Sequence, residues 1–122
     1  MREVVFVFGS NLAGRHGKGA ALEAAKHWGA VYGVGEGRTG NAYALPTKDE
    51  NLRTLPLHEI EQAYVRFGKY AMRNADVQFL LTPAGTGLAG YSLEEIKPFV
   101  RGCAYWRNVW LTGDWFRRDR NG

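Results

Sequence analysis

Two glycine-rich stretches, each preceded by strand-forming residues, constrain the fold of this chain more than any other feature of its sequence. Nine of the 16 glycines lie within the first 40 residues, and three more lie between Gly85 and Gly90. Glycine adopts positive φ without strain and lets another group approach the main chain closely. Residues 4–8 are β-branched or aromatic throughout, which predicts a strand buried on both faces that leads into the stretch 9–19. A buried strand followed by a glycine loop is typical of an α/β unit.

The rest of the chain alternates between helix and strand. Apolar residues three or four positions apart predict a helix at 20–28, with Gly29 in the place of a C-cap. The same spacing predicts the longest helix, starting at Pro56, and a capping box that begins at Ser92 predicts a helix to about Val100. Further strands are expected at 30–32, 43–45, 77–81 and 108–112.

This alternation predicts a compact three-layer α/β/α domain with a mixed, mostly parallel central sheet. With 122 residues, 45% of them hydrophobic, we expect a single domain over residues 1–116 and a charged tail at 117–122. Pro46 and the polar residues after it are expected to end the strand 43–45. No apolar run approaches the roughly 20 residues of a membrane helix, and no signal-peptide pattern is present. Because Cys103 is a single cysteine, a reducing, cytoplasmic location is expected.

Known nucleotide and metal motifs do not fit the chain. Residues 35–40 match G-x-G-x-x-G but precede a strand, and residues 85–90 match it with only one strand left to follow. Neither arrangement provides the strands and helices that half of a dinucleotide-binding domain requires. The histidines His16, His27 and His58 lack the spacing of paired ligands, so we expect neither a metal nor a resident cofactor.

Both glycine loops are expected at the carboxyl ends of strands, where parallel α/β sheets bind ligands. Free backbone N–H groups and helix N-termini at such loops suit phosphate or pyrophosphate. His16 lies within the first loop, either as a phosphate donor or as an ordinary exposed loop residue. The net charge of +4 agrees with an anionic partner, although a solvated surface also produces such an excess.

A second candidate surface lies near the C-terminus, where aromatic residues alternate with arginines. On such a surface the bases of single-stranded nucleic acid stack on the aromatic rings, and the arginines neutralise its phosphates. A last strand packed on the sheet, followed by a solvated tail, has the same composition. A nucleic-acid site here predicts affinity that falls steeply with salt. The residues are Tyr105, Trp106, Trp110, Trp115 and Phe116 with Arg101, Arg107, Arg117, Arg118 and Arg120.

Taken together, the two glycine loops resemble those of the macrodomain family, whose members bind ADP-ribose. Residues 11–21, NLAGRHGKGAA, look like the family's first ligand loop, and residues 82–91, TPAGTGLAGY, look like its phosphate-binding loop. Residues 43–48 and the helix from Pro56 are similar to the corresponding stretch of the terminal ADP-ribose protein glycohydrolase branch. The likeness covers most of residues 3–112.

The resemblance implies an ADP-ribose cleft between the two loops. The diphosphate would lie across the backbone N–H groups of residues 85–88, and residues 17–19 would border the distal ribose. The ligand-binding residues so implied are Ser10, Asn11, His16, Gly17, Lys18, Gly19, Gly85, Thr86, Gly87, Leu88, Ala89, Gly90 and Tyr91.

The glycohydrolase branch also implies a catalytic residue. In that branch a lysine at the position of Lys48 attacks the anomeric carbon of the distal ribose, assisted by an aspartate of the second loop. Ala89 takes the place of that aspartate here, so Asp49, Glu50 or Glu94 would have to approach Lys48 instead. The sequence leaves open whether the protein binds ADP-ribose, hydrolyses its attachment, or sequesters a nucleotide signal in a bacterial or phage setting.

Overall fold

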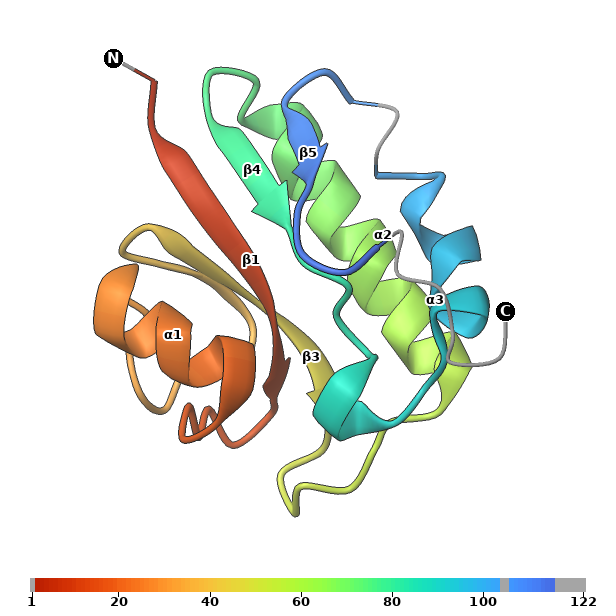
Figure 1. The fold of residues 1–122 in the computed structure, drawn as a ribbon. Coiled ribbons are helices and arrows are strands. Elements are labelled where there is room, and N and C mark those ends of the chain that lie inside the picture. Colours follow the sequence, from red (N-terminus) through yellow and green to blue (C-terminus); the bar gives the residue numbers. More distant parts are fainter. Residues whose placement is uncertain (1, 104–105, 116–122) are drawn as a thin grey trace.

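The structure is a computed structural model that describes residues 2–103 and 106–115. These residues form a five-stranded sheet in the order β2-β3-β1-β4-β5 (Figure 1). β1 pairs in parallel with both β3 and β4, β5 runs parallel to β4, and β2 is antiparallel to β3. The predicted mixed, mostly parallel sheet is confirmed. The strands are β1 (Val4–Asn11), β2 (Gly37–Thr39), β3 (Ala42–Lys48), β4 (Gln78–Leu81) and β5 (Val109–Leu111).

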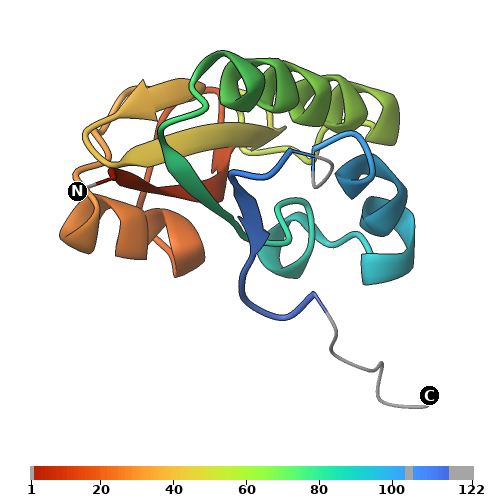
Figure 2. The same cartoon turned by 90° about the horizontal axis from the view of Figure 1, so that it is seen from above.

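Helices cover both faces of the sheet and give the predicted three layers. α1 (Gly19–His27) and α2 (Leu57–Arg73) lie on opposite faces (Figure 2), and α3 (Leu93–Val100) packs into the core on the side of α2. A 3-10 turn, η1 (Gly87–Ala89), precedes α3. The predicted capping box of α3 is present at Ser92. Within the described residues, no helix has the length and hydropathy to cross a membrane.

Alternate side chains of β1 supply two separate cores. Val5 and Val7 face the larger core, which holds the apolar residues of α2 and α3. Phe6 and Phe8 face the smaller core beneath α1, whose other members are mostly alanines. Trp28 closes this smaller core by stacking on Phe6, with ring centroids 5.2 Å apart. The two faces of the sheet therefore carry cores of unequal size.

The strand predicted at 30–32 is wrong. These residues lie between Gly29 and Gly33, both of which have positive φ, and they form a loop. The backbone N–H of Val31 donates to the side-chain oxygen of Thr39 and not to a backbone carbonyl of a strand. The segment instead runs across the loop that follows β1, because Gly33 donates its N–H to the carbonyl of Gly14.

The expectation that Pro46 ends its strand is also wrong, because β3 continues through Pro46 to Lys48. Backbone groups alternate in direction along a strand, so Pro46 turns its nitrogen to the same side as Ala44. That is the side of β2, and β2 pairs with β3 no further than Ala44. The missing N–H of Pro46 therefore removes no ladder hydrogen bond. The strand predicted at 4–8 extends to Asn11, and β2 lies in a stretch where the sequence predicts no strand. The remaining predicted elements begin and end within about one residue of the observed bounds.

The C-terminal aromatic residues mostly pack on the sheet. Trp115 is 2% exposed and its indole N–H donates to the carbonyl of Leu81, while Trp106 packs partly buried against the larger core. Trp110 is 57% exposed and donates to the side-chain oxygen of Gln78. The predicted tail at 117–122 and the other aromatic residues of this set lie outside the described residues, as do three of its arginines. These are Tyr105 and Phe116, with Arg117, Arg118 and Arg120.

Burial of a cysteine thiol and two tyrosine hydroxyls in the larger core predicts a loss of stability at alkaline pH. Burial raises the pKa of Cys103 from 9.0 to about 12 and that of Tyr43 from 10.0 to about 12, and it raises the pKa of Tyr64 well above 10.0. The unfolded chain ionises these groups first, so their stabilising contribution is complete below about pH 9 and is lost as the pH rises toward 12. Urea unfolding at pH 8 and at pH 10.5 should show a lower free energy of unfolding at the higher pH.

A control for this prediction is Cys103→Ala, which removes one of the ionising groups. The variant loses some packing at every pH, but its free energy of unfolding should decline less steeply between pH 8 and pH 10.5. An unchanged free energy of unfolding across this range in the wild-type protein would contradict the prediction.

Candidate ligand-binding cleft

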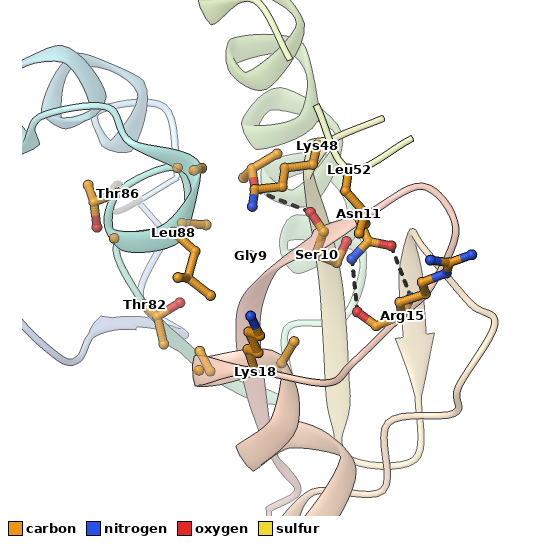
Figure 3. A pocket seen from close by; sticks show the side chains of 18 of the residues that line it. Gly9, Ser10, Asn11, Arg15, Lys18, Lys48, Leu52, Thr82, Thr86 and Leu88 are labelled. Atoms are coloured by element: carbon orange, nitrogen blue, oxygen red, sulfur yellow. Dashed lines mark hydrogen bonds between the residues drawn. The ribbon is translucent and has the colours of Figure 1, made fainter. Parts of the chain in front are cut away.

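A cleft of about 610 Å³ opens at the carboxyl ends of β1, β3 and β4 (Figure 3). It lies where a parallel sheet presents its strand-to-helix loops. Its floor is formed by the end of β1, and its two sides are formed by the loop that enters α1 and by the loop that follows β4. The two glycine-rich stretches therefore face each other across one cavity.

Most of the residues proposed from the sequence line this cleft. Those that line it are Ser10, Asn11, Gly17, Lys18, Gly19, Lys48, Gly85, Thr86, Gly87, Leu88 and Ala89. Three others, His16, Gly90 and Tyr91, do not line it. Lining residues absent from the sequence-based set are Gly9, Arg15, Ala20, Ala21, Tyr32, Thr47, Leu52, Thr82, Pro83 and Ala84. Most of these adjoin the proposed loops in sequence, whereas Tyr32 and Leu52 come from separate segments.

The first loop is shaped by the side chains of Ser10 and Asn11. The carboxamide of Asn11 donates to the carbonyl of Arg15 at 2.8 Å and accepts from the N–H of Arg15 at 2.9 Å, as the dashed lines in Figure 3 show. The hydroxyl of Ser10 donates to the carbonyl of Gly35. A Cβ on Gly14 would lie 2.3 Å from the backbone of Gly33, so only glycine fits there. These polar side chains hold the loop against the segment that follows α1.

His16 does not reach the cleft, contrary to the expectation that it contacts a phosphate there. It is 2% exposed, and its ring stands edge-on to Phe8 and to Tyr32, with centroids 5.2 and 6.1 Å apart. Its Nε2 lies 3.1 Å from the carbonyl of Val31, which can only accept, so this nitrogen carries the proton. His16 therefore supports Tyr32, whose ring lines the cleft.

The second loop leaves backbone donors free on the cleft side of the molecule. Among the described residues, the N–H groups of Gly85, Gly87 and Leu88 donate to no carbonyl. Gly85 has a φ of 104°, and a Cβ there would lie 2.7 Å from the side chain of Ile96. Unpaired N–H groups gathered in a glycine loop form a concave site for an anion, although here the N–H of Thr86 is paired with the carbonyl of Pro83. This arrangement suits a phosphate or diphosphate.

Hydroxyl groups from the larger core and from the segment after β3 hold the second loop by its carbonyls. The hydroxyl of Tyr64 donates to the carbonyl of Ala84 at 2.6 Å, and that of Thr54 donates to the carbonyl of Ala89 at 2.8 Å. The hydroxyl of Tyr91 donates to the carbonyl of Leu55 at 2.8 Å. Tyr91, expected as a ligand contact, thus ties the second loop to the segment that follows Lys48.

The charged residues lining the cleft are all cationic. Arg15, Lys18 and Lys48 line it, and within the described residues no Asp or Glu does. Lys48 extends from the end of β3 into the cavity, toward the side where Leu88 lies (Figure 3). The described cleft is therefore electrostatically matched to an anionic ligand.

The acidic residues proposed as partners of Lys48 are not brought to the cleft. The carboxylate of Asp49 accepts from the N–H groups of Asn51 and Arg53, and Glu94 pairs with Lys97 on the surface. Glu50 is exposed and does not line the cavity. Within the described part of the chain, no three His, Cys, Asp or Glu side chains are grouped so as to hold a metal ion.

Leu52 occupies an unusual backbone conformation beside Lys48. With a φ of 63°, it is the only non-glycine residue with positive φ in the described ranges 2–103 and 106–115. A leucine in this left-handed region costs roughly 1 kcal/mol relative to an extended or right-handed conformation. Its side chain is 43% exposed and lines the cleft.

Comparison with known proteins identifies the fold. No protein-family model matches the sequence, and no curated protein matches it. Solved structures that are similar include the macrodomain of Thermus aquaticus DarG, with a TM-score of 0.72 and 19% identity over 92% of this chain and 89% of that one. The macrodomain of Mycobacterium tuberculosis DarG has a TM-score of 0.67 and 19% identity over 91% and 87%.

A macrodomain protein from Streptomyces coelicolor is similar as well, with a TM-score of 0.58 and 16% identity over 92% of this chain and 87% of that one. The chain therefore has the macrodomain fold, as its resemblance in sequence implies.

The hydroxyl groups that hold the second loop generate a prediction about its stability. Thr54→Val and Tyr91→Phe each remove one hydroxyl with little change in shape, so each should cost about 1 kcal/mol of local stability. Amide hydrogen exchange at Ala89, Gly90 and Tyr91 should then accelerate by roughly fivefold.

The matched control is Thr112→Val, at the end of β5, where the hydroxyl donates to no carbonyl among the described residues. This control should leave exchange in the second loop unchanged. Thr54→Ser keeps the hydroxyl and should restore wild-type exchange. Equal exchange in Thr54→Val and the wild type would show that this hydrogen bond does not hold the loop.

Proposed function

We propose that the cleft binds ADP-ribose, either free or attached to a macromolecule. The observation that carries the proposal is the second loop, where unpaired N–H groups of Gly85, Gly87 and Leu88 stand opposite Lys18 and Lys48. Within the described residues no acidic side chain lines this cavity to repel a diphosphate. The macrodomain fold of the chain agrees with such a ligand.

The positions of the two loops suggest how the ligand would lie. The diphosphate would accept hydrogen bonds from the N–H groups of Gly85, Gly87 and Leu88, since these amides can bind an anion without adding side-chain charge. The N–H of Thr86, which the resemblance also implies as a donor, is taken by the carbonyl of Pro83. The distal ribose would lie between residues 17–19 and Lys48, which line the same cavity. Lys18 would face the phosphates from the other side of the cleft (Figure 3).

Binding is the primary function under this proposal, and hydrolysis through Lys48 is a second candidate. Lys48 reaches the cavity, as a nucleophile acting on the distal ribose would have to. However, the described cleft offers no carboxylate to accept or deliver a proton, which a glycohydrolase of this type requires. An amine also attacks only when it is unprotonated, which is a second requirement of this candidate function.

Calorimetric titration with ADP-ribose tests the binding proposal, with AMP as the control for adenine or single-phosphate affinity. Binding of ADP-ribose in the micromolar range or tighter is expected, which corresponds to about −8 kcal/mol, with AMP clearly weaker. The diphosphate engages more of the free N–H groups than one phosphate can, which is the reason for the difference. Absence of ADP-ribose binding at millimolar ligand would withdraw the proposal.

Failure of that titration would favour the nucleic-acid alternative. A single-stranded oligonucleotide should then bind with affinity that falls steeply as salt is raised, and truncation after Trp115 should weaken it. ADP-ribose bound in the cleft would be far less sensitive to that truncation, because the residues that line the described cleft all lie between Gly9 and Ala89.

Variants of Lys48 separate binding from turnover. Using a protein that carries mono-ADP-ribose on carboxylate side chains, release of free ADP-ribose is measured for the wild type and for each variant. If the wild type releases ADP-ribose, Lys48→Ala should abolish release while changing affinity by less than roughly tenfold. Lys48→Arg keeps the positive charge but stays protonated, so it should bind normally and also fail to release.

The control is Lys18→Ala, which replaces a second lysine of the cleft. This variant should weaken binding while leaving the turnover of bound ligand intact. Unchanged release by Lys48→Ala would end the assignment of Lys48 as a nucleophile. No release by the wild-type protein would leave ADP-ribose binding as the function.

A further inference from the structure

Leu52 combines a left-handed backbone conformation with an exposed apolar side chain. The backbone there is in the left-handed region, which suits Gly or Asn, and an asparagine occupies the preceding position, Asn51. When a leucine in a protein interior has a strained backbone, the energetic cost is offset by the packing of its side chain. Leu52 is 43% exposed, so burial within the chain does not compensate for its conformation.

The loop imposes this conformation firmly. The carboxylate of Asp49 accepts from the N–H groups of Asn51 at 2.8 Å and Arg53 at 3.0 Å. The backbone N–H of Asp49 donates to the carbonyl of Arg53, and that of Leu52 donates to the carbonyl of Asp49. The side chain at position 52 is therefore presented in one direction by a closed turn, and it lines the cleft.

The side chain of Leu52 lies at one side of the cavity. Figure 3 shows Leu52 on the same side of the cleft as Lys48, with Thr86 and Leu88 on the opposite side. The segment that follows Lys48 is tied to the second loop, because the hydroxyl of Thr54 donates to the carbonyl of Ala89. An apolar side chain on the same side of the cavity as Lys48 can cover a bound group there and exclude water from it.

We infer that Leu52 is a specificity-determining residue that packs on the distal ribose of the ligand and makes the cleft prefer ADP-ribose over ADP. The inference rests on the proposed function, because it uses the placement of the distal ribose beside Lys48. The C–H groups of a ribose ring offer an apolar surface to the leucine. ADP carries the same adenosine and diphosphate but lacks this ring, so it makes no contact with Leu52.

Calorimetric titration of the full chain with ADP-ribose and with ADP tests this inference. Leu52→Gly removes the side chain and relieves the backbone strain, and Leu52→Asn keeps a side chain that tolerates positive φ but is polar. Both variants should bind ADP-ribose roughly tenfold more weakly and bind ADP as the wild type does, because only the contact with the distal ribose is lost. Leu52→Met restores an apolar side chain of similar volume and should return the affinity for ADP-ribose to near that of the wild type.

The matched control is Val65→Ala on α2, another exposed apolar side chain that does not line the cleft. It should change neither affinity. Thermal unfolding checks that Leu52→Gly is as stable as the wild type, which removes misfolding as a cause of weak binding.

The outcomes separate this inference from the proposed function. Equal weakening of ADP-ribose and ADP in Leu52→Gly, or no weakening of either, would overturn the role of Leu52 while leaving the proposed function in place. Failure of the wild-type protein to bind either nucleotide would overturn the proposed function, and the inference would fall with it.

Discussion

The parallel pairing of β1 with both β3 and β4 is the constraint on which the candidate site depends. Parallel strands end at the same edge of a sheet, so this pairing brings the loop after β1, Lys48 at the end of β3 and the loop after β4 to one place. Central strands of this kind must be apolar on both faces, and residues 4–8 meet that requirement. Four of these residues, 5–8, supply both cores, and the strand they form also sets the position of the cleft.

The sequence predicts those elements correctly whose formation depends on residues close together in the chain. Capping at Ser92 and the apolar spacing of α2 depend on residues within one element, and both predictions are confirmed. The direction of His16, the continuation of β3 through Pro46 and the places of Tyr32 and Leu52 depend on contacts between segments far apart in the chain. Glycine spacing shows that a loop can bind an anion, but it does not show which side chains of other segments enclose it.

The charge and hydrogen bonding of the described cleft suit an anionic ligand. Cations line the described cavity, and the nearby carboxylate of Asp49 is committed to the backbone of its own turn. Asn11 and Ser10 also direct their polar groups to the main chain. Much of the side-chain polarity around the cleft therefore maintains loop shape, and the contacts left for a ligand come mainly from backbone N–H groups and from lysine and arginine.

The unequal cores described for the two faces of the sheet have a consequence for the motions of the protein. The wall of the cleft formed by α1 rests on the small, alanine-rich core, whereas the opposite wall is fastened to the large core through Tyr64 and Ile96. Elements with little buried apolar surface open more often than the rest of a domain. Of the two walls, α1 and its loop are therefore the one better able to detach as a unit, and a ligand that bridges both walls would fasten the weaker wall to the stronger one.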